Sequence, residues 1–403
     1  MKIFQINVCY PYGSTGKIVK DIHENLIDDG FDSKVIYAYM HKYNNERLIK
    51  LSSNYVFKLQ SLQSRITGYA YAGAFFSTHK LIKILRKEKP DIVHLQCING
   101  FMVNIYKLLE YLKQGNIKTI LTLHAEFMYT AGCGYSYDCN KWKTGCYECA
   151  EINKNRPKSY FFDRSSDEWN RMYKTLIDFD DLIVCCVSDW VKSRVSQSPF
   201  FKKKKIYTVN NGVNINIFNN NYLPSEKENV LRKNKIENSK YILFVTPDFY
   251  SPIKGGNYLI EIAKKMPEKE FVVVGLNDEK KLLPQNVLAI PHTDNQEELA
   301  ILYNEASITL LLSKRETFSM VTAESLCCGT PVIGFKAGAP EMIALKEFSN
   351  FAEYGDIDKI IDYINTMKEY NKKEISKIAC KKYDKSNMYH EYLNIYTSNG
   401  VNN

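Results

Sequence analysis

The chain has 403 residues, more than one compact core usually holds, so we expect two domains. A hydrophobic fraction of 45% and a charged fraction of 25% exclude a disordered or fibrous chain. The net charge of +9 suits an anionic partner, although a Lys- and Asn-rich composition alone gives the same balance. No stretch reaches the roughly 18 apolar residues of a membrane span, and residues 1–8 are too short and polar for a signal peptide. We therefore expect a cytoplasmic protein with mostly reduced cysteines.

Short apolar strands alternate with amphipathic helices along the chain. In the first half, the predicted strands are Ile3–Val8, Lys34–Ala38, Asp91–Leu95, Thr119–Leu123, Leu182–Val187 and Ile206–Val209. In the second half, they are Tyr241–Val245, Phe271–Val274, Val287–Ile290, Ile308–Leu312 and Pro331–Phe335. Apolar residues at helical spacing lie between them, for example in Met102–Leu112, Glu298–Ala306 and Met320–Cys327. This order is typical of α/β domains whose parallel sheets are covered on both faces.

Two segments interrupt this alternation. The polar stretch Asn219–Ser239, which contains Pro224, indicates a linker, so we predict one domain over residues 1–218 and another over 219–383. Residues 124–160 form a strandless insertion rich in Cys, Tyr and Gly, and a long irregular loop in such a domain is usually functional. Ligands of doubly wound sheets bind at the carboxyl ends of the strands, so we expect the site in a cleft between the two domains.

The densest chemical signal is Ser313–Glu324, which follows the strand Ile308–Leu312 and opens a helix. A helix start binds anions, so a diphosphate fits here. Thr317 and Ser319 could each cap this helix. The backbone N–H groups that would then face the ligand are those of Thr317, Phe318, Ser319 and Met320.

Charged side chains around this helix start suit the rest of a nucleotide sugar. Glu324, about one turn into the helix, can accept two hydrogen bonds from a ribose diol, at about 1.5–3 kcal/mol each. Glu316 can reach sugar hydroxyls beyond the phosphates, and Lys254, in Pro252–Gly256, can meet phosphate oxygens as a point charge. The alternative is an ordinary helix start, where acidic residues are favoured anyway.

With Cys328–Gly334 and Gly338–Glu341 downstream, the sequence resembles glycosyltransferase family 4 over nearly its whole length. Its most specific part is the E-x7-E spacing of Glu316 and Glu324. The resemblance implies a GT-B fold of two Rossmann-like domains and transfer with retention of anomeric configuration. It implies that Glu316 contacts the donor sugar, Glu324 the ribose and Lys254 the diphosphate. It also implies that residues 219–383 bind the nucleotide sugar and that the last helix, about residues 384–403, packs back onto the acceptor-side first domain.

Three departures from the family pattern matter. The arginine usual before the lysine is missing from Val245–Tyr250, and Arg315 is a weak substitute. His124 ends a strand where the family often reads His-Asp, but Ala125 follows; we expect His124 at the reacting sugar, with a packed strand-end histidine as the alternative. In the first glycine-rich loop the match is loose, and the expected donor-binding residues there are Gly13 and Gly16.

A cysteine cluster lies in the insertion. We predict a structural zinc site, with free thiols or disulfides as alternatives, formed by Cys133, Cys139, Cys146 and Cys149. Asp178 and Asp180 match the D-x-D motif of metal-dependent glycosyltransferases, but their place just before a strand favours a turn. The resemblance implies catalysis without a metal, so no cofactor is expected for the reaction.

The preferred function is a retaining glycosyltransferase of bacterial surface polysaccharide synthesis, using a nucleotide diphosphate sugar and a glycan or lipid-linked acceptor. The alternatives are a sugar-nucleotide epimerase of the same architecture and a non-enzymatic nucleotide- or nucleic-acid-binding protein. We expect no nucleic acid, because the only basic run is Lys202–Lys205. This run follows Phe200 and Phe201, which indicates either a peripheral contact with the inner membrane face or a solvated loop.

Overall fold

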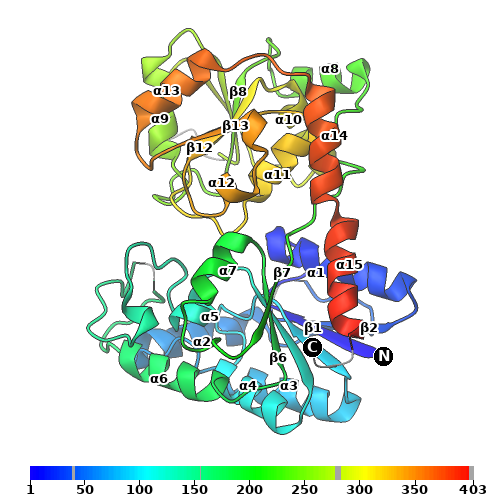
Figure 1. The fold of residues 1–403 in the computed structure, drawn as a ribbon, viewed down its shortest axis with the longest axis vertical. Coiled ribbons are helices and arrows are strands. Elements are labelled where there is room, and N and C mark those ends of the chain that lie inside the picture. Colours follow the sequence, from blue (N-terminus) through cyan, green and yellow to red (C-terminus); the bar gives the residue numbers. More distant parts are fainter. Residues whose placement is uncertain (39–40, 155, 277–282, 399–403) are drawn as a thin grey trace. The chain divides into compact units, whose positions relative to one another are not determined.

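The computed structural model describes residues 1–38, 41–154, 156–276 and 283–398. The chain divides into two compact units, the first formed by Met1–Asn210 and the chain from Tyr389 onward, the second by Asn211–Met388. Each unit contains one parallel sheet with helices alongside its strands (Figure 1). No helix in the described ranges combines the length and apolarity that crossing a bilayer requires.

The first unit has a seven-stranded sheet in the order β3-β2-β1-β4-β5-β6-β7. Its strands are β1 (Lys2–Asn7), β2 (Asp32–Tyr37), β3 (Leu48–Lys50), β4 (Ile92–Leu95), β5 (Lys118–Leu123), β6 (Leu182–Cys186) and β7 (Lys205–Thr208). Its helices are α1 (Gly13–Asp28), α2 (Asn54–Thr67), α3 (Phe75–Glu88), α4 (Ile105–Gln114), α5 (Phe127–Thr130), α6 (Ser165–Leu176) and α7 (Asp189–Val195). Strand order reverses between β1 and β4, so this is the place where such a sheet accepts a ligand.

The second unit has a six-stranded sheet in the order β10-β9-β8-β11-β12-β13. Its strands are β8 (Ile242–Val245), β9 (Phe271–Val274), β10 (Val287–Ile290), β11 (Ile308–Leu311), β12 (Val332–Phe335) and β13 (Ser349–Ala352). Its helices are α8 (Pro224–Lys233), α9 (Gly256–Lys265), α10 (Gln296–Glu305), α11 (Met320–Cys327), α12 (Pro340–Ile343), α13 (Ile357–Thr366) and α14 (Lys372–Tyr383), with α15 (Lys385–Thr397) at the unit boundary. Here the order reverses between β8 and β11.

The division between the units falls at Asn210, eight residues before the predicted residue 218. The intervening segment pairs with the second unit, because Val213 N–H donates to Tyr383 O (2.7 Å) and Lys385 N–H to Val213 O (3.0 Å). The later part of α15 contacts the first sheet: the Tyr396 hydroxyl lies 2.6 Å from His94 Nδ1, and the Tyr392 hydroxyl lies 2.9 Å from Thr122 Oγ1.

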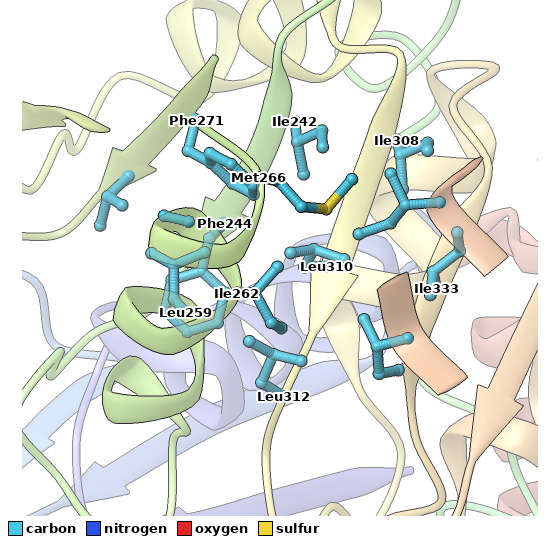
Figure 2. Packing of buried hydrophobic residues seen from close by; sticks show 14 of the residues in the cluster. Ile242, Phe244, Leu259, Ile262, Met266, Phe271, Ile308, Leu310, Leu312 and Ile333 are labelled. Atoms are coloured by element: carbon cyan, nitrogen blue, oxygen red, sulfur yellow. The ribbon is translucent and has the colours of Figure 1, made fainter. Parts of the chain in front are cut away.

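A close-packed core fixes α9 on the second sheet. Figure 2 shows Leu259 and Ile262 of α9 among side chains of the sheet, including Phe244 and Leu310. Leu259, Ile262 and Leu310 have no solvent exposure. Because burial of each such side chain stabilises the fold by about 1.5–3 kcal/mol, the start of α9 is held firmly against the ends of β8 and β11.

The predicted linker is wrong in part, because its residues include the helix α8, which begins at Pro224. The Glu226 carboxylate accepts a hydrogen bond from the Leu223 N–H and so caps the start of this helix. The proposed membrane contact at Phe200 and Phe201 is also wrong. Neither ring is exposed, and Phe200 packs against Trp169 with ring centroids 5.3 Å apart. In the basic run, the Lys204 ammonium is turned inward and donates to Ile177 O.

Candidate functional site

Two loops meet where the strand order of the second sheet reverses. One follows β8 and leads into α9, and the other follows β11 and leads into α11. β8 and β11 are parallel neighbours, with Leu310 opposite Phe244 near their carboxyl ends. Lys314 N–H donates to Ile253 O (2.8 Å), so the two loops are also bonded to each other. Ligands of open α/β sheets bind at such a point.

Glycine is required in the first of these loops. Gly255 has φ +83°, and a Cβ there would lie 2.2 Å from Leu312 O. At Gly256 a Cβ would lie 2.2 Å from Phe249 O. Only a residue without a side chain allows this close approach, which sets the preceding Lys254 at the end of β11.

Lys254 and Glu316, which the sequence analysis assigned separate roles, form an ion pair. Lys254 Nζ donates to Glu316 Oε1 at 2.7 Å, and the side chains are 23% and 19% exposed. The backbone of Glu316 is fixed as well, since its N–H donates to Ala337 O and its carbonyl accepts from Ala339 N–H. A half-buried ammonium and carboxylate therefore lie side by side, a pairing that can offer a cation to an anionic group and an acceptor to a hydroxyl.

Helix α11 begins as the sequence indicates, at one of the two predicted caps. Ser319 is the N-cap, its Oγ accepts from Thr322 N–H (3.2 Å), and Thr317 lies outside the helix. The backbone of Ser319 has φ +83°, a left-handed conformation that costs a non-glycine residue about 1–3 kcal/mol. Phe318 is buried and Thr317 is partly exposed, so packing of Phe318 holds this strained turn in place. The turn lies next to the first N–H groups of helix α11, which begins at Met320.

Glu324 is half-buried on α11 and is oriented by a tyrosine from the preceding helix. The Tyr303 hydroxyl, on α10, donates to Glu324 Oε2 at 3.4 Å. Burial, and after it the Glu324 charge, raises the pKa of Tyr303 well above its ordinary value, so the phenol stays a hydrogen-bond donor. No pattern in the sequence indicates Tyr303, because a strand and a loop separate it from Glu324.

In the first unit, the two predicted glycines lie at the start of α1. Gly13 is its first residue, with φ +68°, a conformation that favours glycine. Gly16 is buried, and a Cβ there would lie 3.0 Å from Pro11 C and 3.3 Å from Cys9 Sγ. These contacts let α1 approach the loop after β1 closely, beside the reversal of strand order.

His124 lies immediately after β5 and is partly buried. Its Nε2 lies 2.7 Å from Oε1 of Gln96, which follows β4, and the amide oxygen can only accept, so Nε2 carries the proton. Burial lowers the pKa of His124 to about 4. The imidazole is therefore neutral at pH 7, and Gln96 orients it through a contact that the sequence did not indicate.

The four cysteines of the insertion are free thiols, with Cys133 and Cys146 buried and Cys139 and Cys149 partly so. Burial raises the pKa of the Cys133 and Cys146 thiols to about 12. Within the described ranges, no three His, Cys, Asp or Glu side chains are grouped so that they could hold a metal ion. The zinc site therefore stays a prediction, to be tested by metal analysis.

Buried ion pairs also hold the insertion. Arg156 donates to Glu168, whose other oxygen accepts Ala70 N–H (2.8 Å), and Arg194 lies 3.3 Å from Glu126. These pairs join the insertion to the helices around it.

The chain is matched by two family models, Glycosyl transferases group 1 over residues 226–383 and Glycosyltransferase Family 4 over residues 15–217. An uncharacterized 41.2 kDa protein in the cps region of Klebsiella pneumoniae is 24% identical over 79% of this chain and 82% of that protein. A provisionally assigned colanic acid biosynthesis glycosyl transferase of Escherichia coli is 22% identical over 39% of this chain and 41% of its own. The structure of HepE from Anabaena in complex with UDP-glucose superposes with a TM-score of 0.69 and 14% identity, covering 99% and 100% of the two chains.

The two parallel-sheet units have the GT-B fold, and the two family models define the chain as a glycosyltransferase. Since the Family 4 model covers half of the sequence and the group 1 model most of the remainder, the chain belongs to Glycosyltransferase Family 4.

Proposed function

We propose that the protein transfers a sugar from a nucleotide diphosphate sugar to a glycan or lipid-linked acceptor, with retention of configuration and without a catalytic metal. The observation that carries the proposal is the pairing of Lys254 with Glu316 beside the start of α11, at the reversal of strand order. A cation, a helix start and a carboxylate are the groups that a diphosphate joined to a sugar requires.

In this proposal, each group of the site contacts a different part of the nucleotide sugar. Lys254 and the N–H groups from Thr317 to Met320 bind the diphosphate. Glu324, oriented by Tyr303, accepts hydrogen bonds from the ribose hydroxyls. Glu316 exchanges its bond to Lys254 for a hydroxyl of the donor sugar.

The reaction breaks the bond between the sugar C1 and the diphosphate oxygen and forms a bond from the acceptor oxygen to C1. The acceptor proton leaves with the nucleoside diphosphate. Lys254 and the α11 dipole stabilise the charge that develops on the leaving diphosphate, a preorganised electrostatic effect that requires no Mg²⁺. Neutral His124 is proposed to hydrogen-bond a hydroxyl of the reacting sugar, since an imidazole with a pKa of about 4 carries no positive charge at pH 7.

The names of two relatives support a role in surface polysaccharide synthesis, one lying in a cps region and the other named for colanic acid biosynthesis. The solved complex of HepE with UDP-glucose supports a uridine nucleotide as the first donor to test. We propose a capsular, exopolysaccharide or lipopolysaccharide type of glycan as the product, made at the cytoplasmic face of the membrane.

A thermal-stabilisation screen of nucleotide sugars tests the donor proposal. A ligand at 100 times its dissociation constant adds about 2.7 kcal/mol of stability, which is readily measured. The stabilising donor is then incubated with acceptors and the products are analysed. Free nucleoside diphosphate with a new glycoside supports transfer, an isomerised donor supports an epimerase, and binding without turnover supports a non-enzymatic protein.

A further inference from the structure

Helix α2 is turned so that its apolar face is on the outside. Tyr55, Leu59, Leu62 and Ile66 are spaced at helical intervals and lie within about 60° of one another around the helix axis. All four are exposed, Tyr55 by 72%. The buried residues of this helix are Gln60 and Ser64 on the opposite side. A helix of a globular protein normally buries its apolar stripe, so this stripe is available to something outside the chain.

Exposed aromatic residues also lie in two segments that are hydrogen-bonded to α2. Gln60 Nε2 donates to Ser77 Oγ at 2.7 Å, which joins α2 to the start of α3, where Phe75 and Phe76 are exposed, the latter by 78%. Arg65 O accepts from Tyr160 N–H at 2.8 Å, which joins the end of α2 to the insertion. The end of the insertion and the two residues after it add three consecutive exposed rings, those of Tyr160, Phe161 and Phe162. We call these nine residues the apolar patch.

The α2 and α3 members of the patch lie in a segment rich in cations, whereas Asp163 follows the third segment. From residue 47 to residue 87 the sequence contains no Asp or Glu, and its eight basic residues are Arg47, Lys50, Lys58, Arg65, Lys80, Lys83, Arg86 and Lys87. Lys58 and Arg65 lie along one edge of the α2 stripe by their spacing. Further cations cover the aromatic members, with Lys107 Nζ 5.0 Å from the Phe75 ring and the Arg164 guanidinium 4.8 Å from the Phe162 ring.

We propose that the apolar patch docks the first unit on the surface of an anionic phospholipid bilayer. Exposed aliphatic and aromatic side chains on one helix face, flanked by Lys and Arg, are the pattern of helices that lie in the lipid headgroup region. The cations meet acidic headgroups, and their long stems allow the charge to stay at the interface while the rings enter it. A protein partner would require acidic groups facing these cations, whereas a bilayer supplies them at any position.

The inference is independent of the proposed transfer reaction, because it concerns a different surface and needs no donor to test. The apolar patch also takes the place of Phe200 and Phe201 as the membrane contact, because those two rings are buried in the same unit.

Vesicle co-sedimentation of the purified full chain tests the proposal. The vesicles are phosphatidylcholine alone or phosphatidylcholine with 30% phosphatidylglycerol, at low and high salt. We expect binding to the anionic vesicles that weakens at high salt. The triple variant Leu59→Gln, Leu62→Gln, Ile66→Gln should lower the partition coefficient at least about tenfold, and Lys58→Gln with Arg65→Gln should do the same.

Matched controls separate the patch from general effects. Leu223→Gln with Ile378→Gln removes exposed apolar residues of the second unit, and Lys202→Gln with Lys203→Gln removes exposed cations of the first. Both controls should bind vesicles like the parent chain. Because the patch residues are exposed, every variant should melt within a few degrees of the parent.

Equal recovery of the parent chain in the supernatant with both vesicle types would overturn the proposal. Equal binding by the triple variant and its control would also overturn it. A dimer in solution that the triple variant abolishes, without vesicle binding, would assign the patch to a second copy of the chain instead.

Discussion

Replacing Lys254 by Gln tests the assignment of the diphosphate site most sharply. The Lys254 ammonium bonds Glu316 at 2.7 Å, and both side chains are about four-fifths buried. The variant removes the cation and leaves the Glu316 carboxylate facing the phosphates. Loss of one charge-assisted hydrogen bond costs about 1.5–3 kcal/mol, so UDP affinity should fall about 10- to 150-fold.

The second substitution, Glu316→Gln in the Lys254→Gln background, removes the opposing charge. It should therefore recover part of the lost UDP affinity, although it removes a second polar group of the site. With the sugar nucleotide, Glu316→Gln alone should lower turnover more than affinity, because its proposed contact is to the reacting sugar.

Isothermal titration with UDP measures all three variants, and Lys314→Gln is the matched control. Lys314 lies in the β11–α11 loop with Glu316 and is exposed, so its loss should change affinity less than about threefold. The reasoning is refuted if Lys254→Gln binds UDP as well as Lys314→Gln does, or if the double variant binds more weakly than Lys254→Gln alone.

Four further outcomes are expected. Glu324→Ala should weaken donor binding through the ribose with little change in melting temperature, and equal affinity for UDP would exclude the ribose contact. Gly255→Ala should destabilise the second unit by about 1–3 kcal/mol and weaken UDP binding, whereas Gly30→Ala, whose Cβ would meet nothing within 4 Å, should leave UDP binding unchanged. Burial lowers the pKa of His94 to about 3, below the ordinary value of 6.5 that the unfolded chain retains, so stability falls as pH decreases below 6.5. At pH 5, His94 should lower the free energy of unfolding by about 2 kcal/mol relative to neutral pH. If the melting temperature of His94→Gln falls with pH as steeply as that of the parent chain, this prediction is contradicted. The zinc prediction for the four cysteines of the insertion requires about one zinc per chain in reduced protein, and elemental analysis showing none would refute it.

The alternation of strands and helices could be predicted from the sequence because buried parallel strands are continuous apolar runs. Among the elements that escaped prediction, two strands and one helix have a clear physical reason. β3 has only three residues, none fully buried, and β13 has two partly exposed residues among four, so neither forms an apolar run. α8 buries none of its residues, so it lacks an apolar face and resembles a linker in sequence.

Side-chain partners were predicted less well than backbone elements. The bond between Lys254 and Glu316 joins residues 62 positions apart and depends on two neighbouring strands ending together. The Phe200–Phe201 pair was misinterpreted because adjacency to lysines suggested a surface, whereas the packing of Phe200 against Trp169 places it inside. The outward apolar face of α2 has helical periodicity in the sequence, but periodicity alone does not show which face is buried.

The anomeric configuration of the product tests the central claim most directly. The stabilising nucleotide sugar is incubated with acceptor in EDTA, and the products are followed by ¹H NMR and by release of nucleoside diphosphate. The account predicts equal amounts of nucleoside diphosphate and of a glycoside with the configuration of the donor, and loss of both in Glu316→Gln. Return of the donor as its epimer, an inverted glycoside, or a reaction that stops in EDTA while the melting temperature is unchanged would contradict it.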